Sequence, residues 1–272
     1  MFQQSKAKQS KAKQSKAKQS KAKQSKAKQS KAKQSKAKQS KAKQSKAKQS
    51  KAKKHMQRDI YTNQDHMETL YCGASFNKDK YIELPKGFTT EVHKKRTERW
   101  EAGHIIPAEN FGRAFSEWRE GNEVCVDRKG KDFKGRKCAE KANKEYRLMQ
   151  SDLYNLYPAV GAVNATRQNY NFGMLANTSN NSYRTFGSCE MIIDSKGRKA
   201  QPPERSRGMI ARTYMYFEAT YPKYKMSRQQ RQLMEAWDKQ YPVTKWECER
   251  SEKIENVQGN KNPILTNRCK KL

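Results

Sequence analysis

Residues 100–107 read Trp100-Glu101-Ala102-Gly103-His104-Ile105-Ile106-Pro107. Side chains alternate well enough from Arg99 to Ile106 to predict a β-strand, and Pro107 ends it because proline has no N–H to donate to a sheet. The chain holds only four histidines, and histidine is the side chain whose ordinary pKa allows acid–base work near neutral pH. His104, at the end of the strand, is therefore a candidate for proton transfer. The alternative is a satisfied core or surface group.

Segments after this strand predict further short strands and amphipathic helices. Apolar side chains spaced three and four residues apart predict a helix over 206–221. Ser227 followed by Gln230 has capping-box spacing, which predicts a second helix over 227–240. The run 191–193, followed by a turn signal, predicts a short strand. Because strands and helices mix without a βαβ order, we expect an α+β fold.

A low-complexity tail precedes the folded part. Residues 4–53 are ten copies of Gln-Ser-Lys-Ala-Lys, and residues 1–54 hold 21 lysines and no acidic residue. The period of five matches neither helix nor strand, and alanine is the repeat's only apolar residue. We therefore expect 1–54 to be a disordered Lys-rich tail, preceding a domain over 55–272. Its charge fits either a solvated spacer or a sequence-independent tether for a polyanion.

Net charge and hydropathy limit the classes of protein to which this chain can belong. The chain has 272 residues and a formal net charge of +33, and residues 55–272 keep +12 of it. Such a balance favours anionic partners. Hydrophobic residues make up 33% of the chain, and no apolar run approaches the roughly 18 residues of a transmembrane helix. The N-terminus shows no apolar stretch of a secretory signal either.

Six cysteines lie singly in the domain: Cys72, Cys125, Cys138, Cys189, Cys248 and Cys269. An even number without a Cys-x-x-Cys pair predicts three disulfides and an oxidising compartment, with six reduced core thiols as the alternative. Roughly fifteen pairings are possible for six cysteines. Cys125–Cys138 and Cys248–Cys269 close the shortest loops, and the first would staple a basic loop over 124–139. The cysteines argue for export more strongly than the missing signal argues against it.

Three later stretches carry a family resemblance. Residues 151–170 read SDLYNLYPAVGAVNATRQNY, and residues 202–214 read PPERSRGMIARTY. Near the C-terminus stand Tyr241-Pro242-Val243, Trp246-Glu247, Arg250, Gln258-Gly259-Asn260 and Asn262-Pro263. In this order the motifs resemble those of the bacterial endonuclease I family, periplasmic or secreted non-specific nucleases, over about residues 68–271.

The resemblance implies a ββα-metal nuclease core with additional helices. In that core a strand histidine is the general base, and an asparagine on the following helix holds Mg²⁺ or another divalent cation. His104 and Asn164 match these two residues. Arg136, close before Cys138, matches the family's catalytic, phosphate-binding arginine. The residue types suit phosphodiester hydrolysis, because a neutral imidazole can deprotonate water and a guanidinium can grip a phosphate.

One position departs from the family pattern. Gly103 stands where the family has a glutamate that binds the metal, so Glu101 becomes the candidate second ligand. On an extended strand Glu101 lies about 10 Å along the chain from His104, so metal binding rests on one protein ligand or is weakened. Lys137 and Arg167 are further candidate contacts to nucleic acid, and the alternative for Arg167 is a salt bridge within a helix.

The resemblance thus predicts a monomeric, Mg²⁺-dependent, sequence-non-specific endonuclease that is periplasmic or secreted. Its partner is DNA, with RNA left open as a further substrate, and no membrane is involved. Two alternatives stay open. One is a catalytically weakened relative that binds nucleic acid without efficient cleavage. The other is a secreted, disulfide-bonded protein with an unrelated role.

Overall fold

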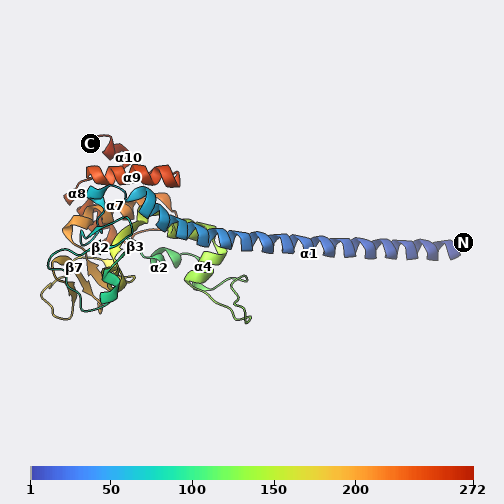
Figure 1. Ribbon diagram of the computed structural model, residues 1–272. Coiled ribbons are helices and arrows are strands. Elements are labelled where there is room, and N and C mark those ends of the chain that lie inside the picture. The colour runs from blue at the N-terminus through green and yellow to red at the C-terminus, as the bar shows by residue number, and fades with distance from the viewer. Residues whose placement is uncertain (1) are drawn as a thin grey trace. The chain divides into compact units, whose positions relative to one another are not determined.

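A computed structural model describes the backbone of residues 2–272 and the side chains of 5–33 and 51–272. The chain divides into two compact units, Met1–Ser45 and Lys46–Leu272. Figure 1 traces the elements along the chain. Among the described residues, no helix is both long and apolar enough to cross a membrane.

The repeat forms helix α1 (Phe2–His55), in place of the predicted disorder. Lysine, glutamine and alanine are all good helix formers, and the repeat contains no glycine or proline that would interrupt them. The prediction of disorder rested on the missing apolar face and left out this helix propensity. Side chains of residues 5–33 are all exposed, so this part of the helix buries nothing. Side chains of 34–50 lie outside the described residues.

Short helical segments make up much of the unit Lys46–Leu272. The segments before strand β4 are η1 (Met56–Ile60), η2 (Gln64–His66), η3 (Lys94–Thr97), α2 (Ala108–Gly112), α3 (Ser116–Arg119), α4 (Arg136–Ala142) and α5 (Lys144–Gln150). The later ones are η4 (Leu153–Asn155), α6 (Gly161–Arg167), α7 (Glu204–Thr220), α8 (Arg228–Gln240), α9 (Lys245–Gln258) and α10 (Thr266–Cys269).

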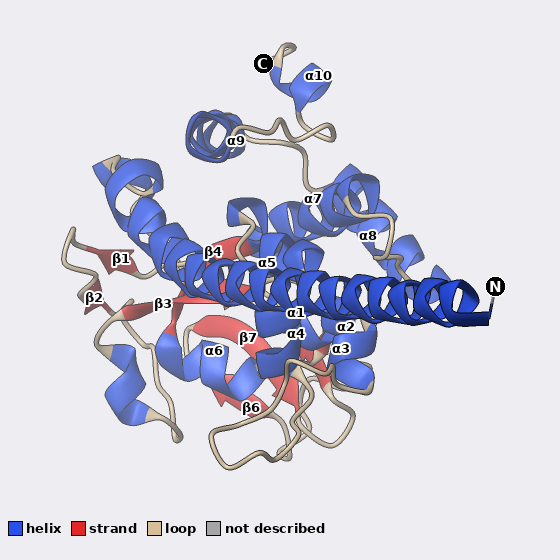
Figure 2. Cartoon of the chain, turned by 90° about the vertical axis from the view of Figure 1, so that its right-hand side faces the viewer, coloured by secondary structure: helices blue, strands red, loops and turns tan. Residues whose placement is uncertain are grey.

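An antiparallel strand pair followed by a helix positions the candidate site. Strand β3 (Trp100–His104) pairs with β4 (Leu156–Val160), so that His104 lies opposite Leu156. Helix α6 begins directly after β4 and packs against both strands. Gly161 lets α6 also lie close to η3, because a Cβ there would lie 2.4 Å from the carbonyl oxygen of Arg96. Figure 2 shows β3, β4 and α6 together.

The other strands form two small sheets. A four-stranded sheet has the order β5-β8-β7-β6, with β5 (Asn171–Phe172) parallel to β8 (Lys199–Gln201). Strands β6 (Arg184–Phe186) and β7 (Cys189–Asp194) complete it in antiparallel pairing. A two-stranded sheet joins β1 (Ser75–Phe76) to β2 (Ile82–Glu83). These strands, with the helices, confirm a mixed α+β architecture.

The predicted amphipathic helices are confirmed by α7 and α8. On α7 the buried side chains include Ile210, Tyr214 and Phe217, which are the positions that the spacing selects. Helix α8 begins after Ser227, whose hydroxyl accepts a hydrogen bond from the Gln230 N–H at 3.1 Å. The two helices pack side by side (Figure 2). The expected strand at 191–193 lies within β7.

Three disulfides close loops in this unit, and both short-loop pairings are confirmed. Cys125–Cys138 and Cys248–Cys269 span 13 and 21 residues. The third, Cys72–Cys189, spans 117 residues and ties the segment before β1 to β7. The expected basic loop 124–139 is a loop only as far as Gly135, because α4 begins at Arg136. Its last residues are helical because Cys138 and Ala139 are buried on that helix.

Candidate active site

A pocket of about 470 Å³ lies at the end of β3. Its lining includes Lys53, His104, Arg136, Gln150, Asn164 and Asn169. The structure therefore brings together three of the residues that the sequence selected: the histidine from β3, the arginine from α4 and the asparagine from α6. His104 and Asn164 are 60 residues apart along the chain, and the pairing of β3 with β4 brings the start of α6 next to β3.

The ring of His104 is held by one hydrogen bond to the main chain. Its Nε2 lies 2.8 Å from the carbonyl oxygen of Gln150. Because a carbonyl can only accept, Nε2 carries the proton and Nδ1 keeps its lone pair in the neutral ring. Burial is the main cause that lowers the pKa of His104 to about 4. The bond to the Gln150 carbonyl raises the pKa, and the nearby charges of Arg136, Lys53 and Arg167 contribute to lowering it. At neutral pH the ring is thus an uncharged proton acceptor.

The backbone after His104 is clamped by Asn155. The Asn155 side chain accepts from the N–H of Ile106 at 2.8 Å and donates to the Ile106 carbonyl at 3.0 Å. This amide is fully buried, and its paired bonds act as a short extension of the β3–β4 pairing. Such a clamp fixes the strand end from which the imidazole projects.

Arg167, predicted as a nucleic-acid contact, also holds this strand end. Its guanidinium donates to the carbonyl oxygens of His104 at 2.8 Å and Ile105 at 2.7 Å, and to that of Tyr170 at 2.8 Å. The side chain is buried and lies over the ring of Phe172, 4.1 Å from its centroid. The alternative for Arg167, a salt bridge within a helix, is not formed with any described residue, because its described partners are carbonyl oxygens. Arg167 positions His104 through the backbone.

Glu101 and Asn164 lie next to each other. The Asn164 amide donates to Glu101 Oε2 at 3.2 Å, which leaves Asn164 Oδ1 as an unshared acceptor in that pair. Glu101 also receives two bonds from Arg96, at 2.8 and 2.5 Å. The pKa of the Glu101 carboxyl is lowered, because the bonds from Arg96 and Asn164 outweigh the effect of its partial burial. Glu101 is therefore an ionised carboxylate beside Asn164, the predicted metal ligand.

Gly103 leaves room for the Asn164 side chain. A Cβ at position 103 would lie 2.8 Å from Asn164 Oδ1, so a larger residue there must displace that amide. The glycine that replaces the family's usual glutamate thus coincides with an amide oxygen occupying the space beside the strand. A glutamate at position 103 could not be accommodated without moving the Asn164 side chain.

The donor atoms here fit Mg²⁺. Asn164 lines the pocket, and Glu101 contacts Asn164 without lining it. The carboxylate of Glu101 and the amide oxygen of Asn164 are hard ligands, and Mg²⁺ binds through few protein oxygens while keeping several waters. The buried amide oxygen of Gln150, which lines the pocket, has no hydrogen-bond partner among the described residues and adds an unused acceptor. Within the part of the chain that the structure describes, no three His, Cys, Asp or Glu side chains gather as a closed metal site.

Arg136 supplies an exposed positive charge to the pocket. It is the first residue of α4, directly after Gly135, and 44% of its side chain is exposed. Its Nε donates to Glu140 at 3.1 Å, an exposed pair of the kind that contributes little to stability. The guanidinium can therefore turn to a phosphate at low cost. Lys137 is exposed on the next position and does not line the pocket.

Sequence reasoning missed several residues of this site. Gln150 acts through its backbone carbonyl and Asn155 through a buried amide, and neither carries a sequence signal because such bonds depend on the fold. Gln168 has φ +52°, a left-handed conformation that side chains other than glycine and asparagine rarely adopt. It ends α6 and lines the pocket beside Asn164. Lys53 also lines the pocket, although the sequence places it in the Lys-rich tail 1–54.

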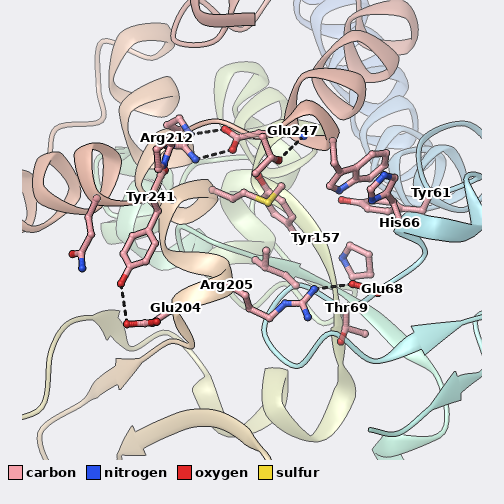
Figure 3. A pocket seen from close by; sticks show the side chains of 18 residues that line it. Tyr61, His66, Glu68, Thr69, Tyr157, Glu204, Arg205, Arg212, Tyr241 and Glu247 are labelled. Atoms are coloured by element: carbon pink, nitrogen blue, oxygen red, sulfur yellow. Dashed lines mark hydrogen bonds and ion pairs between the residues drawn. The ribbon is translucent and has the colours of Figure 1, made fainter. Parts of the chain in front are cut away.

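A second pocket, of about 380 Å³, holds none of these residues. Figure 3 shows its charged side chains turned toward partners inside it. Arg205 pairs with Glu68 at 2.8 Å, and Arg212 pairs with Glu247 at 2.6 Å. It opens on the side of β4 where Tyr157 lies, whereas Leu156 lines the pocket with His104. Because its charges are already paired, the pocket at His104 is the better candidate for chemistry.

A family model described as endonuclease I matches residues 13–269. The chain belongs to the endonuclease I family. Endonuclease-1 of Buchnera aphidicola subsp. Acyrthosiphon pisum (strain APS) is 38% identical over 207 residues, which is 75% of this chain and 75% of that protein. An extracellular deoxyribonuclease of Aeromonas hydrophila is 37% identical over 211 residues, covering 76% of this chain and 85% of the relative. A periplasmic deoxyribonuclease of the same organism is 37% identical over 212 residues, covering 76% and 81%.

Proposed function

We propose that this member of the endonuclease I family hydrolyses phosphodiester bonds of DNA without sequence preference, using His104 as general base and a divalent cation, Mg²⁺ in the first place. The observation that carries the proposal is the His104 ring: burial keeps it neutral, its Nε2 bond to Gln150 leaves Nδ1 as the proton acceptor, and it shares a pocket with Asn164 and Arg136. The names of the relatives, deoxyribonucleases and an endonuclease, support DNA as substrate.

In the proposed reaction His104 Nδ1 accepts a proton from a water molecule. The resulting oxygen forms a bond to phosphorus while the bond from phosphorus to the 3′ oxygen breaks, and that oxygen then takes up a proton from solvent. Because Arg167 and Asn155 fix the strand end, the ring meets the water without reorganising. Arg136 binds a phosphate oxygen and offsets the charge that develops on the phosphate.

Glu101 and Asn164 are the residues that would hold the cation. When bound, it stabilises negative charge on the phosphate and on the departing oxygen. Glu101 would have to share its carboxylate with Arg96, which already occupies both oxygens. This shared carboxylate supports weaker metal binding than two free ligands would give.

Export is part of the proposal. Relatives are named extracellular and periplasmic, and the three disulfides suit an oxidising compartment. A net charge of +12 outside the tail favours sequence-independent contacts to phosphates. RNA shares the phosphodiester chemistry, and we propose it as a second substrate for the same pocket.

The test is cleavage of supercoiled plasmid by the intact protein with Mg²⁺, with EDTA, and by His104→Ala. We expect EDTA to stop cleavage and His104→Ala to lower the rate by about 10²–10⁴-fold. His66→Ala is the matched control, since His66 stacks on Trp246 in the second pocket and should leave the rate within a few-fold. Cleavage by His104→Ala at the wild-type rate would contradict the assignment of the base.

The same assay separates the alternative of a weakened relative that binds without efficient cleavage. The observation that favours it is the double hydrogen bond from Arg96 to Glu101, which competes with a cation for the carboxylate. Binding of DNA in EDTA with no cleavage at any Mg²⁺ concentration would support this alternative. Arg96→Ala should then restore measurable cutting, because it frees Glu101.

A further inference from the structure

The last copy of the repeat reaches the candidate active site. Lys53 lines the same pocket as His104, Arg136 and Asn164. Its charge lowers the pKa of His104, after the effects of burial and of Arg136. It also lowers the pKa of Lys80, after burial and Arg99. The ammonium group therefore lies close enough to act electrostatically on His104, at the end of β3, and on Lys80, shortly before β2.

The fold holds Lys53 in this place. Ala52 is 5% exposed and Met56 is 1% exposed, and both belong to the hydrophobic core, whereas the alanines of residues 5–33 are exposed. The last turn of α1 is thus fixed to the domain through its apolar side. Lys53 itself is exposed and forms no hydrogen bond or ion pair with a described residue.

Lys51 provides the internal contrast. It is two residues away on the same helix, which places it about 200° around the axis from Lys53. It lines a different pocket, with His55, Leu148 and Tyr221. Two lysines of the same repeat copy therefore face different surroundings, and only one of them belongs to the pocket that holds His104.

We propose that Lys53 is a substrate-binding residue that contacts a phosphate next to the one bound by Arg136. This proposal rests on the proposed nuclease function. An ammonium is suited to such a contact because it offers three donors without a fixed geometry, which tolerates any backbone position of nucleic acid. Two cations, one from α4 and one from the repeat, would then border the path that the substrate follows past His104.

The test compares Lys53→Gln with Lys51→Gln in the full chain. Glutamine matches lysine in helix propensity, so both variants keep α1, which thermal unfolding checks. Binding of a short DNA duplex is measured in EDTA from about 50 to 200 mM salt. We expect Lys53→Gln to flatten the log–log salt slope by about 0.9, the value of one phosphate contact, and Lys51→Gln to leave it near that of the wild type.

Cleavage kinetics add a second measurement. We expect Lys53→Gln to raise KM by about 10-fold with kcat nearly unchanged, because a binding contact to a flanking phosphate is lost equally in ground and transition states. Equal changes in salt slope and KM for the two variants would overturn the proposal in favour of a general charge effect. No change for either variant would also overturn it. A protein that binds DNA but never cleaves it refutes the proposed function, and the salt slopes still decide the role of Lys53.

Discussion

The low pKa of His104 predicts how activity depends on pH. Burial lowers it from 6.5 to about 4, so the neutral, proton-accepting ring persists well below neutral pH. We expect kcat/KM to fall as pH drops through about 4, and not near 6.5. The unfolded chain takes up this proton at higher pH than the folded one, so the stability contribution of His104 is also lost as pH falls from 6.5 toward 4.

The measurement is initial cleavage rate against pH, with a return to neutral pH to show that inactivation is reversible. A midpoint at 6.5 would show an ordinary, solvated imidazole, contrary to the hydrogen-bonded ring described here.

Asn164 is expected to control the use of Mg²⁺. Its Oδ1 is the oxygen left unshared beside Glu101, so Asn164→Ala should raise the Mg²⁺ concentration at half-maximal rate by about 10-fold or more. Asn169→Ala is the matched control, because Asn169 lines the same pocket but its amide is held by Glu109. A Mg²⁺ titration with an unchanged midpoint and rate for Asn164→Ala would argue against ligation.

At the scale of elements, Arg167 joins helix α6 to strand β3. Its removal leaves buried carbonyls of His104 and Ile105 without a donor, at about 1–3 kcal/mol for each group. We expect Arg167→Ala to lower the free energy of unfolding by about 3 kcal/mol or more and to reduce kcat through a displaced His104. Urea denaturation and cleavage rate are the measurements.

Arg113→Ala serves as the control for Arg167→Ala. Its side chain is 68% exposed and pairs with Glu109 one helical turn away, so stability should change by less than about 1 kcal/mol. Equal losses for the two variants would mean that the clamp on β3 adds no more stability than a surface pair.

Local patterns predicted the elements better than the contacts between them. Helices α7 and α8 and the loops closed by Cys125 and Cys248 followed from spacing alone, because each is decided within about 20 residues. His104, Arg136 and Asn164 followed from family motifs, and the structure places them in one pocket. The carbonyl partners of Arg167 could not be predicted, because its sequence position does not show contacts to residues some 60 positions away.

At the scale of the whole molecule, the repeat predicts a strong dependence of binding on salt. The described part from Lys6 to Lys33 carries twelve lysines, all exposed, with no acidic residue among them. Replacing these twelve by glutamine keeps helix propensity and removes the charge. Each lost phosphate contact should flatten the salt slope on duplex DNA by about 0.9, so five contacts change it by roughly 4–5.

Binding is measured in EDTA from about 50 to 200 mM salt, beside the unchanged protein. The catalytic rate at saturating substrate should stay the same, since His104 and Asn164 are untouched. Superimposable slopes would show that the repeat is a spacer and that the charge of the remaining chain accounts for the binding.

The disulfide between Cys72 and Cys189 has a consequence for biosynthesis. It joins the first and fourth cysteines of the chain and encloses the pair Cys125–Cys138. During synthesis from the N-terminus, Cys125 is the first cysteine available to pair with Cys72, and a Cys72–Cys125 disulfide is not native. The thiol must therefore wait through more than a hundred further residues or be released by exchange. The yield of native enzyme should depend on a disulfide isomerase in the compartment where it folds.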